Sequence, residues 1–295
     1  MRLEKIITLA NQKVMLRFSA MERSLRATGC DLPLWVIPYD NERFDLPANA
    51  TWWELPDVRR LLSEHRSHPM TAKYQCFTTD NYQFVDSDVI FLRNPEKVLA
   101  QQTGFITSCG HWGSPDHTFT EASLKVLKKI STCWQTLVFN AGQFACDRAL
   151  YSLTDLEKQC CDPRYIDTCL KFPFHDQPGT VLLANLSGVP IHNLTLPPVS
   201  MESTWAGSYP DDNFAAYWQN EQRKPYLVHW AGCDVTVPRP IDQLFLDYFT
   251  EDESRRWQQE VADTLARKVR RQRSLKTQLR KLAHASQAFM SEWKR

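Results

Sequence analysis

The sequence predicts a layered α/β domain with a parallel sheet, followed by a helical C-terminal extension. An apolar run rich in β-branched residues, 5–10, precedes a stretch with apolar residues at helical spacing that ends at Gly29. A second apolar run, 32–38, follows. A strand, a helix and a further strand in this order begin a parallel sheet covered by helices. From residue 251 the pattern becomes continuously helical, which predicts the extension.

The elements between these two regions are short and separated by turn residues. Apolar runs bounded by Gly, Pro, Asn or Asp predict further strands at residues 82–85, 89–92, 105–107, 180–186 and 225–228. Helical patterns cover residues 61–72, where His68-Pro69 interrupts the pattern, and residues 147–156. With 295 residues, of which 43% are hydrophobic, the chain has enough apolar mass for a large core, and wholesale disorder is excluded.

Charge divides the chain into two parts. The formal net charge is +1, but residues 251–295 carry twelve Lys or Arg against six Asp or Glu, which leaves 23 basic and 28 acidic residues before them. The mildly acidic body argues against a nucleic-acid partner. We therefore expect one domain over residues 1–250 and a basic amphipathic extension over 251–295. The extension could bind an anionic membrane surface, join two copies in a homodimer, or pack on its own domain.

The cysteines and the N-terminus predict an intracellular location. Nine Cys occur, no pair has the C-x-x-C spacing of a zinc site, and free thiols in a reducing cytosol are the expected state. The apolar stretch near the N-terminus is too short for a signal peptide, and no apolar run approaches the roughly 20 residues of a membrane span. We expect a cytoplasmic protein, with peripheral attachment to the inner face of the membrane as one option.

The most informative segment is an apolar strand that ends in Asp86-Ser87-Asp88. Two carboxylates so close together need a cation, a metal ion or open solvent, because like charges in an apolar setting are costly. The carboxyl ends of strands are also where α/β sheets bind ligands. Such an oxygen-rich pair suits Mg²⁺ or Mn²⁺ shared with substrate phosphates. The alternative is a solvated turn whose Asp side chains cap backbone amides.

Four segments in chain order resemble the GT-A glycosyltransferases with a DxD motif, in particular the family-8 type and the enzymes of capsular polysaccharide or lipopolysaccharide synthesis. Residues 84–95 (FVDSDVIFLRNP) are similar to the DxD segment, and residues 139–142 (FNAG) to the FNSG or FNAG segment downstream of it. Asp176-Gln177 is similar to the DQ segment, and residues 229–232 (HWAG) to the late HxxG segment. The resemblance covers residues 5–235.

The resemblance implies a GT-A nucleotide-diphospho-sugar transferase fold, with a Rossmann-like, mixed and mostly parallel sheet. It implies transfer of a hexose from a nucleotide-sugar donor to a hydroxyl of a glycan or glycolipid acceptor, assisted by Mn²⁺ or Mg²⁺. The implied metal ligands are Asp86, Asp88 and His229. The implied donor-binding residues are Lys73, Asp86, Ser87, Asp88 and Asn140. Asp176 and Gln177 would be catalytic, the first as a base in an inverting enzyme or the second as a dipole in a retaining one.

The sequence also departs from the family pattern. A longer acidic run after the DQ segment is replaced by Pro178-Gly179, and Cys233-Asp234 stand where a basic residue is common. A non-catalytic GT-A-like protein that binds a sugar or a partner is therefore the main alternative. Individually, His229 could be a core histidine and the FNAG and DQ segments could be turns. A nucleotidyltransferase is disfavoured because no Gly-rich phosphate loop follows the first strand.

Overall fold

The computed structural model describes residues 1–171 and 176–292, with side chains described as far as residue 272. The chain forms two compact units. The first comprises residues 1–233 and 239–248, and the second comprises residues 234–238 and the chain from residue 249 onward.

The first unit is organised by a mixed sheet, which has seven strands in the described part of the chain, in the order β3-β2-β1-β4-β7-β6-β8. Its strands are β1 Lys5–Ala10, β2 Leu34–Pro38, β3 Ala50–Trp52, β4 Tyr82–Asp86, β6 Phe105–Thr107, β7 Gln143–Cys146 and β8 Ile191–Asn193. Every neighbouring pair is parallel except the two that involve β7, which runs against both β4 and β6. A second, two-stranded sheet pairs β5 Val89–Phe91 with β9 Leu227–His229 in antiparallel register.

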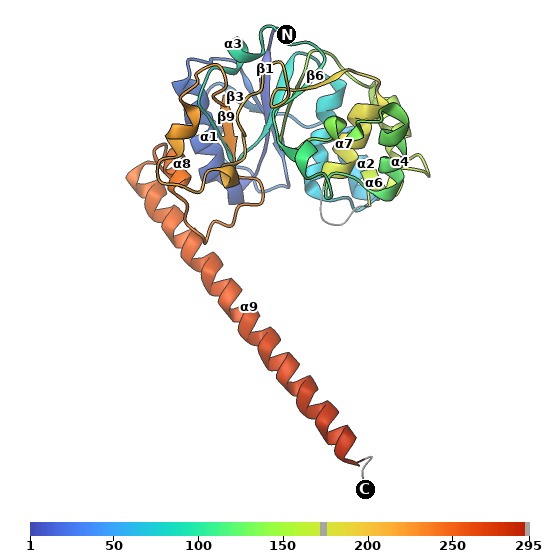
Figure 1. Ribbon diagram of the computed structural model, residues 1–295, viewed down its shortest axis with the longest axis vertical. Coiled ribbons are helices and arrows are strands. Elements are labelled where there is room, and N and C mark those ends of the chain that lie inside the picture. The colour runs from blue at the N-terminus through green and yellow to red at the C-terminus, as the bar shows by residue number, and fades with distance from the viewer. Residues whose placement is uncertain (172–175, 293–295) are drawn as a thin grey trace. The chain divides into compact units, whose positions relative to one another are not determined.

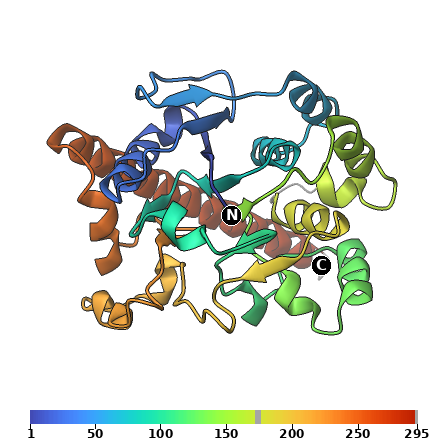
Figure 2. The same cartoon turned by 90° about the horizontal axis from the view of Figure 1, so that it is seen from above.

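Helices cover both faces of the main sheet (Figures 1 and 2). Helix α1 packs on one face, whereas α2, α4, α5, α6 and α7 pack on the other. The α-helices of this unit are α1 Met15–Ala27, α2 Pro56–Glu64, α3 Pro95–Leu99, α4 Glu121–Ile130, α5 Leu153–Cys160, α6 Ile166–Cys169, α7 Gln177–Leu186 and α8 Gln243–Leu246. The 3₁₀ segments are η1 Gln12–Val14, η2 Pro69–Thr78, η3 His111–Gly113, η4 Trp134–Leu137, η5 Ala206–Ser208, η6 Phe214–Trp218 and η7 Pro240–Asp242.

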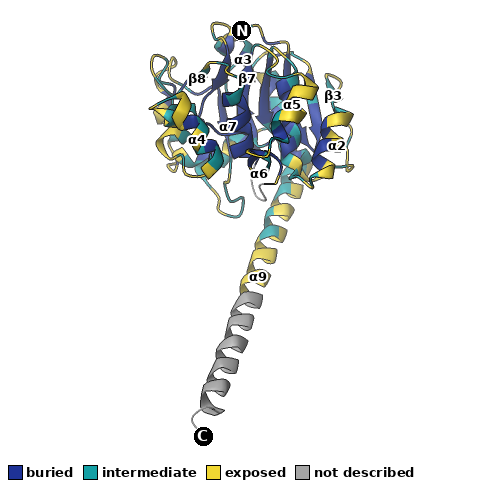
Figure 3. Ribbon diagram, turned by 90° about the vertical axis from the view of Figure 1, so that its right-hand side faces the viewer, coloured by how far each residue is buried: buried dark blue, intermediate teal, exposed yellow. Residues whose placement is uncertain are grey.

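The sheet divides the apolar interior into two cores. Along β1, Ile7 and Leu9 face the core under α2 and α7, whereas Ile6 and Ala10 face the core under α1. Successive residues of a strand project to opposite faces, so a strand covered on both sides must be apolar throughout. This explains why the β1 sequence KIITLA does not alternate between apolar and polar residues, and Figure 3 shows the central strands as buried.

The predicted fold class is confirmed: the first unit is an α/β structure with a mostly parallel sheet, and a long helix is present at the C-terminus. The first predicted strand, helix and strand correspond to β1, α1 and β2. The predicted helix over 61–72 is divided into α2 and the 3₁₀ segment η2, which begins at Pro69. The helix predicted over 147–156 begins only at Leu153, where the Ser152 side chain accepts a hydrogen bond from the backbone N–H of Asp155 and caps it.

One predicted strand is wrong: residues 180–186 belong to helix α7. Residues 180–185 are all buried, so the segment shows the continuous apolar run that is also typical of a central strand. The start of the helix is marked by Asp176 at the N-cap position and Pro178 in the first turn, a favourable position for proline because the first helical N–H groups have no partner in the helix. The Pro178-Gly179 pair therefore begins a helix and does not form a turn.

The second unit contains the long helix α9, Glu251–Glu292. Its start is a capping box, in which Glu253 N–H donates to Thr250 Oγ1 and Thr250 N–H donates to the Glu253 carboxylate. Leu265 and Val269 are 49% and 37% exposed. Lys268 forms an ion pair with Asp234 within the same unit.

Two expectations about the whole chain can be compared with the structure. The nine cysteines are free thiols, as predicted, and most of them are buried. Among the described residues, none of the helices is both long enough and apolar enough to span a membrane.

Candidate functional site

The candidate site is built at the carboxyl end of β4. Asp86 is the last residue of this strand, and a tight turn through Ser87 and Asp88 leads into β5. Strand β5 pairs with β9 so that Val89 lies opposite His229, and the backbone N–H of Trp230 donates to the carbonyl oxygen of Asp88 over 3.0 Å. The small sheet therefore carries His229 to the same edge as the two carboxylates, although it is far from them in the sequence.

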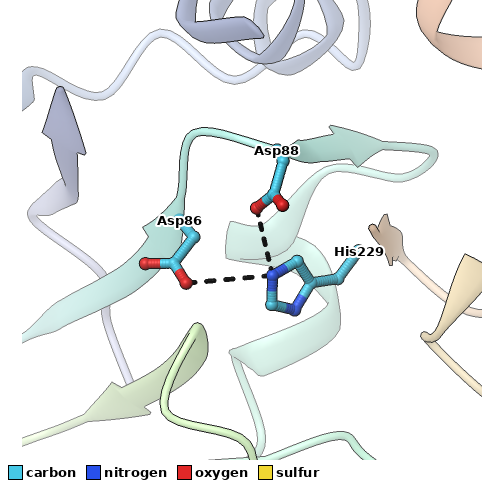
Figure 4. A group of neighbouring side chains, drawn as sticks. All are labelled: Asp86, Asp88 and His229. Carbon is cyan, nitrogen blue, oxygen red and sulfur yellow. Dashed lines mark ion pairs between the residues drawn. The ribbon is translucent and has the colours of Figure 1, made fainter. Parts of the chain in front are cut away.

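Asp86, Asp88 and His229 converge on one point (Figure 4). Asp88 Oδ1 lies 3.1 Å and Asp86 Oδ2 lies 3.9 Å from His229 Nε2. One ligand atom from each side chain can be chosen so that all lie within 4.8 Å of one another. Ligands of an octahedral ion at about 2.1 Å are about 3 Å apart, so small side-chain adjustments would let all of these atoms bind a single divalent ion.

The chain leaves room for this arrangement at Gly142. A Cβ atom at this position would lie closer than 3.0 Å to His229 Cε1 and to Asp86 Oδ2. Gly142 also fixes the strand end, because its carbonyl oxygen accepts a hydrogen bond from Asp86 N–H over 2.8 Å. The glycine of the FNAG segment is thus required by the close approach of two predicted metal ligands.

The pKa values of Asp86, Asp88 and His229 are shifted from their ordinary values for different reasons. Burial raises the pKa of Asp86, and the carboxylates of Asp88 and Asp176 add to this effect, which Lys73 and His229 only partly oppose. Burial acts in the same direction on Asp88, but the charge and hydrogen bond of His229 outweigh it and lower the pKa of Asp88 below its ordinary value. For His229 burial would lower the pKa, yet the two carboxylates raise it. Negative charge therefore dominates this edge of the sheet, as a cation site requires.

Lys73 connects Asp86 to Asp176. Its side chain is 0% exposed, and Nζ lies 3.2 Å from Asp86 Oδ1 and 2.7 Å from Asp176 Oδ2. Its third contact is a hydrogen bond of 3.0 Å to the carbonyl oxygen of Ala141. Burial alone would lower the pKa of Lys73, but the two carboxylates raise it, so this ammonium stays charged. The ammonium thus donates hydrogen bonds to Asp86 and Ala141 and forms an ion pair with Asp176.

Asn140 and Gln177 form a second pair beside the carboxylates. Asn140 Nδ2 donates to Gln177 Oε1 over 3.2 Å, and Asn140 Oδ1 accepts from Gly142 N–H over 2.7 Å. The other end of the Gln177 amide, Nε2, is buried and has no hydrogen-bond partner among the described residues. Buried amide groups are almost always hydrogen-bonded, so this orphan donor next to Asp176 is a candidate position for a ligand oxygen.

The structure brings together nearly all of the predicted site residues. Lys73 comes from η2, Asp86 and Asp88 from the β4–β5 turn, Asn140 from the loop before β7, Asp176 and Gln177 from the start of α7, and His229 from the end of β9. The side chain of Ser87 is buried in the turn and takes no part in the hydrogen bonds or ion pairs that link the other residues.

Tyr39, which the sequence analysis does not single out, is affected by the charges of the site. This residue directly follows β2, and burial together with the charges of Asp86, Asp88 and Asp176 raises its pKa well above the ordinary value. A signal was present, because Tyr39 follows a predicted strand at its carboxyl end, where α/β sheets bind ligands.

Comparison with solved structures identifies the fold. The chain superimposes on the galactosyltransferase LgtC, solved in complex with donor and acceptor sugar analogues, with a TM-score of 0.52 and 13% identity over 86% of this chain and 99% of LgtC. It also superimposes on WbbM, a bifunctional glycosyltransferase, with a TM-score of 0.53 and 13% identity over 89% of this chain and 51% of WbbM. The chain has the GT-A fold.

This result confirms the predicted GT-A fold. At 13% identity the likeness concerns the fold alone, and the chemistry has to be argued from the site. No protein-family model and no curated protein sequence matches the chain.

Proposed function

We propose that this protein is a metal-dependent glycosyltransferase, which moves a hexosyl group from a nucleotide-sugar to a hydroxyl of a glycan or glycolipid. The observation that carries the proposal is the convergence of Asp86, Asp88 and His229 next to the orphan amide of Gln177. A site for a cation and a site for a neutral oxygen ligand thus adjoin each other. The likeness of the fold to two solved glycosyltransferases supports this assignment.

Asp86, Asp88 and His229 would hold the divalent ion. Two carboxylates suit both Mg²⁺ and Mn²⁺, but an imidazole ligand favours the softer transition metal, so we propose Mn²⁺ as the better fit. A divalent ion bound there supplies positive charge, which offsets the negative charge of the departing nucleoside diphosphate.

Gln177 would bind the reacting sugar. Its Oε1 is occupied by Asn140, and this hydrogen bond turns Nε2 toward the unfilled position, where it would donate to a sugar hydroxyl. In this proposal Asn140 orients Gln177, in addition to any contact of its own with the donor. Asp176, next to Gln177 at the start of α7, would accept a hydrogen bond from the same sugar.

Lys73 would act as a positioning residue. Its ammonium makes two hydrogen bonds and an ion pair within the protein, and its side chain is fully buried, so direct contact with the donor would require breaking an existing interaction. We therefore propose that Lys73 compensates the charges of Asp86 and Asp176 and holds both carboxylates at the site. Without it, two carboxylates would face each other in an apolar setting.

A donor-hydrolysis assay tests the proposal. The full chain is incubated with Mn²⁺ and, separately, with the uridine, guanosine, adenosine and thymidine diphosphate sugars, and release of the nucleoside diphosphate is followed by chromatography. We expect release from at least one donor, loss of release on addition of EDTA, and loss in Asp88→Asn. Binding of a donor without release, with or without added saccharides, would instead favour the non-catalytic alternative.

A further inference from the structure

Trp205 is an exposed indole next to a predicted metal ligand. It is 46% exposed, although tryptophan is usually among the more buried residues. Its backbone forms a parallel β-bridge with His229. Residues paired across such a bridge project to the same side, so the Trp205 side chain leaves the backbone on the side from which His229 reaches the carboxylates.

The indole is held rigidly. Its Nε1–H donates to the carbonyl oxygen of Ala231 over 2.9 Å, so the polar group of the ring is already satisfied within the protein. A Cβ atom at Gly207 would lie closer than 3.0 Å to three atoms of the ring, which means that only glycine allows the chain to pass so close beneath the indole. An aromatic ring that is already immobile loses little conformational entropy when a ligand covers it.

The backbone that carries Trp205 is fixed as well. The carbonyl oxygen of the preceding residue, Thr204, accepts a hydrogen bond from His229 N–H over 2.7 Å. Thr204 Oγ1 accepts from Gln143 Nε2 over 2.6 Å. Because Gln143 is the first residue of β7 and His229 is the last residue of β9, these two hydrogen bonds connect the segment that carries the ring to both sheets.

The surroundings of the ring indicate which ligand it fits. Ser203, Gly207 and Ser208 are small or hydroxyl-bearing neighbours in the same turn, and the Ser203 and Ser208 hydroxyls lie 2.9 Å apart. A single apolar face among hydroxyls is too small for a protein partner, which needs several hundred Å² of apolar surface. It matches a pyranose ring, whose C–H groups carry partial positive charge toward an aromatic face while its hydroxyls point outward to hydrogen-bonding groups.

We infer that Trp205 is a stacking platform for a pyranose ring of the acceptor saccharide. This inference rests on the proposed function, because the donor would occupy the adjoining cation site and the sugar beside His229 would then be the acceptor. Trp205 defines the substrate class as a saccharide with at least one C–H face free of axial hydroxyls. Ser203 and Ser208 supply hydroxyls at the rim of the platform.

Binding of soluble saccharides tests this inference without requiring activity. The probes are methyl glucoside, methyl galactoside, N-acetylglucosamine, lactose, maltose and chitobiose, titrated into the full chain with Mn²⁺ and followed by saturation-transfer NMR. We expect at least one to bind, with the strongest saturation on its ring C–H protons. Trp205→Ala should weaken that binding about tenfold, whereas Trp205→Phe, which keeps an aromatic face, should retain most of it.

Two further variants separate stacking from general damage. Gly207→Ala adds a methyl group under the indole and should displace the ring, which weakens saccharide binding although Trp205 is present. Ile130→Ala removes an equally exposed apolar side chain from the end of α4 and should leave binding unchanged. Thermal unfolding and Mn²⁺ affinity should be the same in all four variants.

Three results would overturn the inference. The first is that none of the saccharide probes binds, and the second is that Trp205→Ala binds them as well as the parent protein does. The third is that Trp205→Ala weakens the binding of uridine diphosphate and not that of saccharides, which would make the ring a nucleobase platform. Failure of the proposed function looks different. In that case donor hydrolysis is absent while saccharide binding still depends on Trp205.

Discussion

The two units of this protein use charge in opposite ways. In the first unit, Lys73 is fully buried and its ammonium contacts two carboxylates and a carbonyl oxygen of the site. In the second unit, Lys268 is 43% exposed and pairs with Asp234, which is 40% exposed. Buried charges are stable only when their partners are in place, whereas exposed ion pairs contribute little. The candidate chemistry is therefore built into the interior of the first unit, whereas the Lys268–Asp234 pair of the second unit is exposed to solvent.

The largest effect is expected when the cation site loses a ligand. Asp88→Ala should abolish metal-dependent donor binding, with a loss of at least about a hundredfold, and should leave the fold intact. Asp88 is partly exposed, and its removal relieves the repulsion with Asp86. Isothermal titration with Mn²⁺ and a nucleotide-sugar measures the loss. Asp167→Ala, at an exposed site on α6, is the matched control, and parent-like Mn²⁺ binding by Asp88→Ala would refute the site.

A pair of lysine variants tests the comparison directly. Lys73→Met should lower the free energy of unfolding by about 3 to 5 kcal/mol, because it leaves Asp86 and Asp176 buried without their cation. Lys268→Met should have no measurable effect. Urea denaturation of the full chain provides both values. Adding Asp176→Asn to Lys73→Met should recover part of the loss, since it removes one uncompensated charge. Equal effects of the two single variants would mean that the buried and exposed lysines do not differ as described.

Sequence reasoning succeeded where local pattern and chemistry agree. The β4 strand with Asp86 and Asp88 at its end follows from an apolar run that stops at two carboxylates. The strand predicted over 180–186 failed because a helix buried on all sides has the same apolar pattern as a central strand. The start of this helix could have been recognised from Asp176 and Pro178, since both are typical of a first turn.

Other features of the site could not be predicted from local sequence. The contacts of Lys73 join residues from three separate segments, and only the folded chain shows that its ammonium lies between two site carboxylates. The orphan amide of Gln177 depends on the orientation of Asn140 in another loop. The need for glycine at position 142 arises from the close approach of His229 and Asp86, which come from two different sheets. These are long-range juxtapositions, whereas propensity and periodicity describe neighbours in the chain.

Acid should weaken the first unit through His111. Burial, with smaller effects of His117 and His229, lowers the pKa of His111 to about 4. The unfolded chain takes up a proton at this residue below about pH 6.5, whereas the folded protein does not do so until about pH 4. Above about pH 6.5, His111 therefore does not change the free energy of unfolding. As the pH drops from about 6.5 toward 4, this residue lowers the free energy of unfolding by up to about 3 kcal/mol.

Substitution of His111 isolates this effect from other titrating groups. Urea denaturation of metal-free protein across this pH range should give a shallower decline for His111→Gln than for the parent. The same decline in both proteins would show that His111 is not held neutral by its surroundings.

The smallest effect on the first unit is expected from deletion of residues 251–295. Among the residues that the structure describes, both apolar cores are formed by residues that precede α9, so the free energy of unfolding should change by less than about 0.5 kcal/mol. The deletion should instead weaken binding of the chain to anionic surfaces. Arg267, Lys268, Arg270 and Arg271 give the helix a cluster of positive charge, and each basic residue near an anionic surface contributes roughly 1 kcal/mol.

Sedimentation with vesicles decides between the uses of α9. If the helix attaches the protein to a membrane, the full chain pellets with phosphatidylglycerol vesicles but not with phosphatidylcholine vesicles, and the truncated chain remains in solution. Arg270→Glu with Arg271→Glu should also abolish pelleting while leaving the helix intact. If α9 instead joins two copies, light scattering should give the mass of a dimer for the full chain and of a monomer for the truncated chain. This dimer should persist at salt concentrations that screen the membrane interaction. If the truncated chain fails to fold, the apolar residues of the extension, such as Trp257 and Val261, belong to the core, and both attachment hypotheses are wrong.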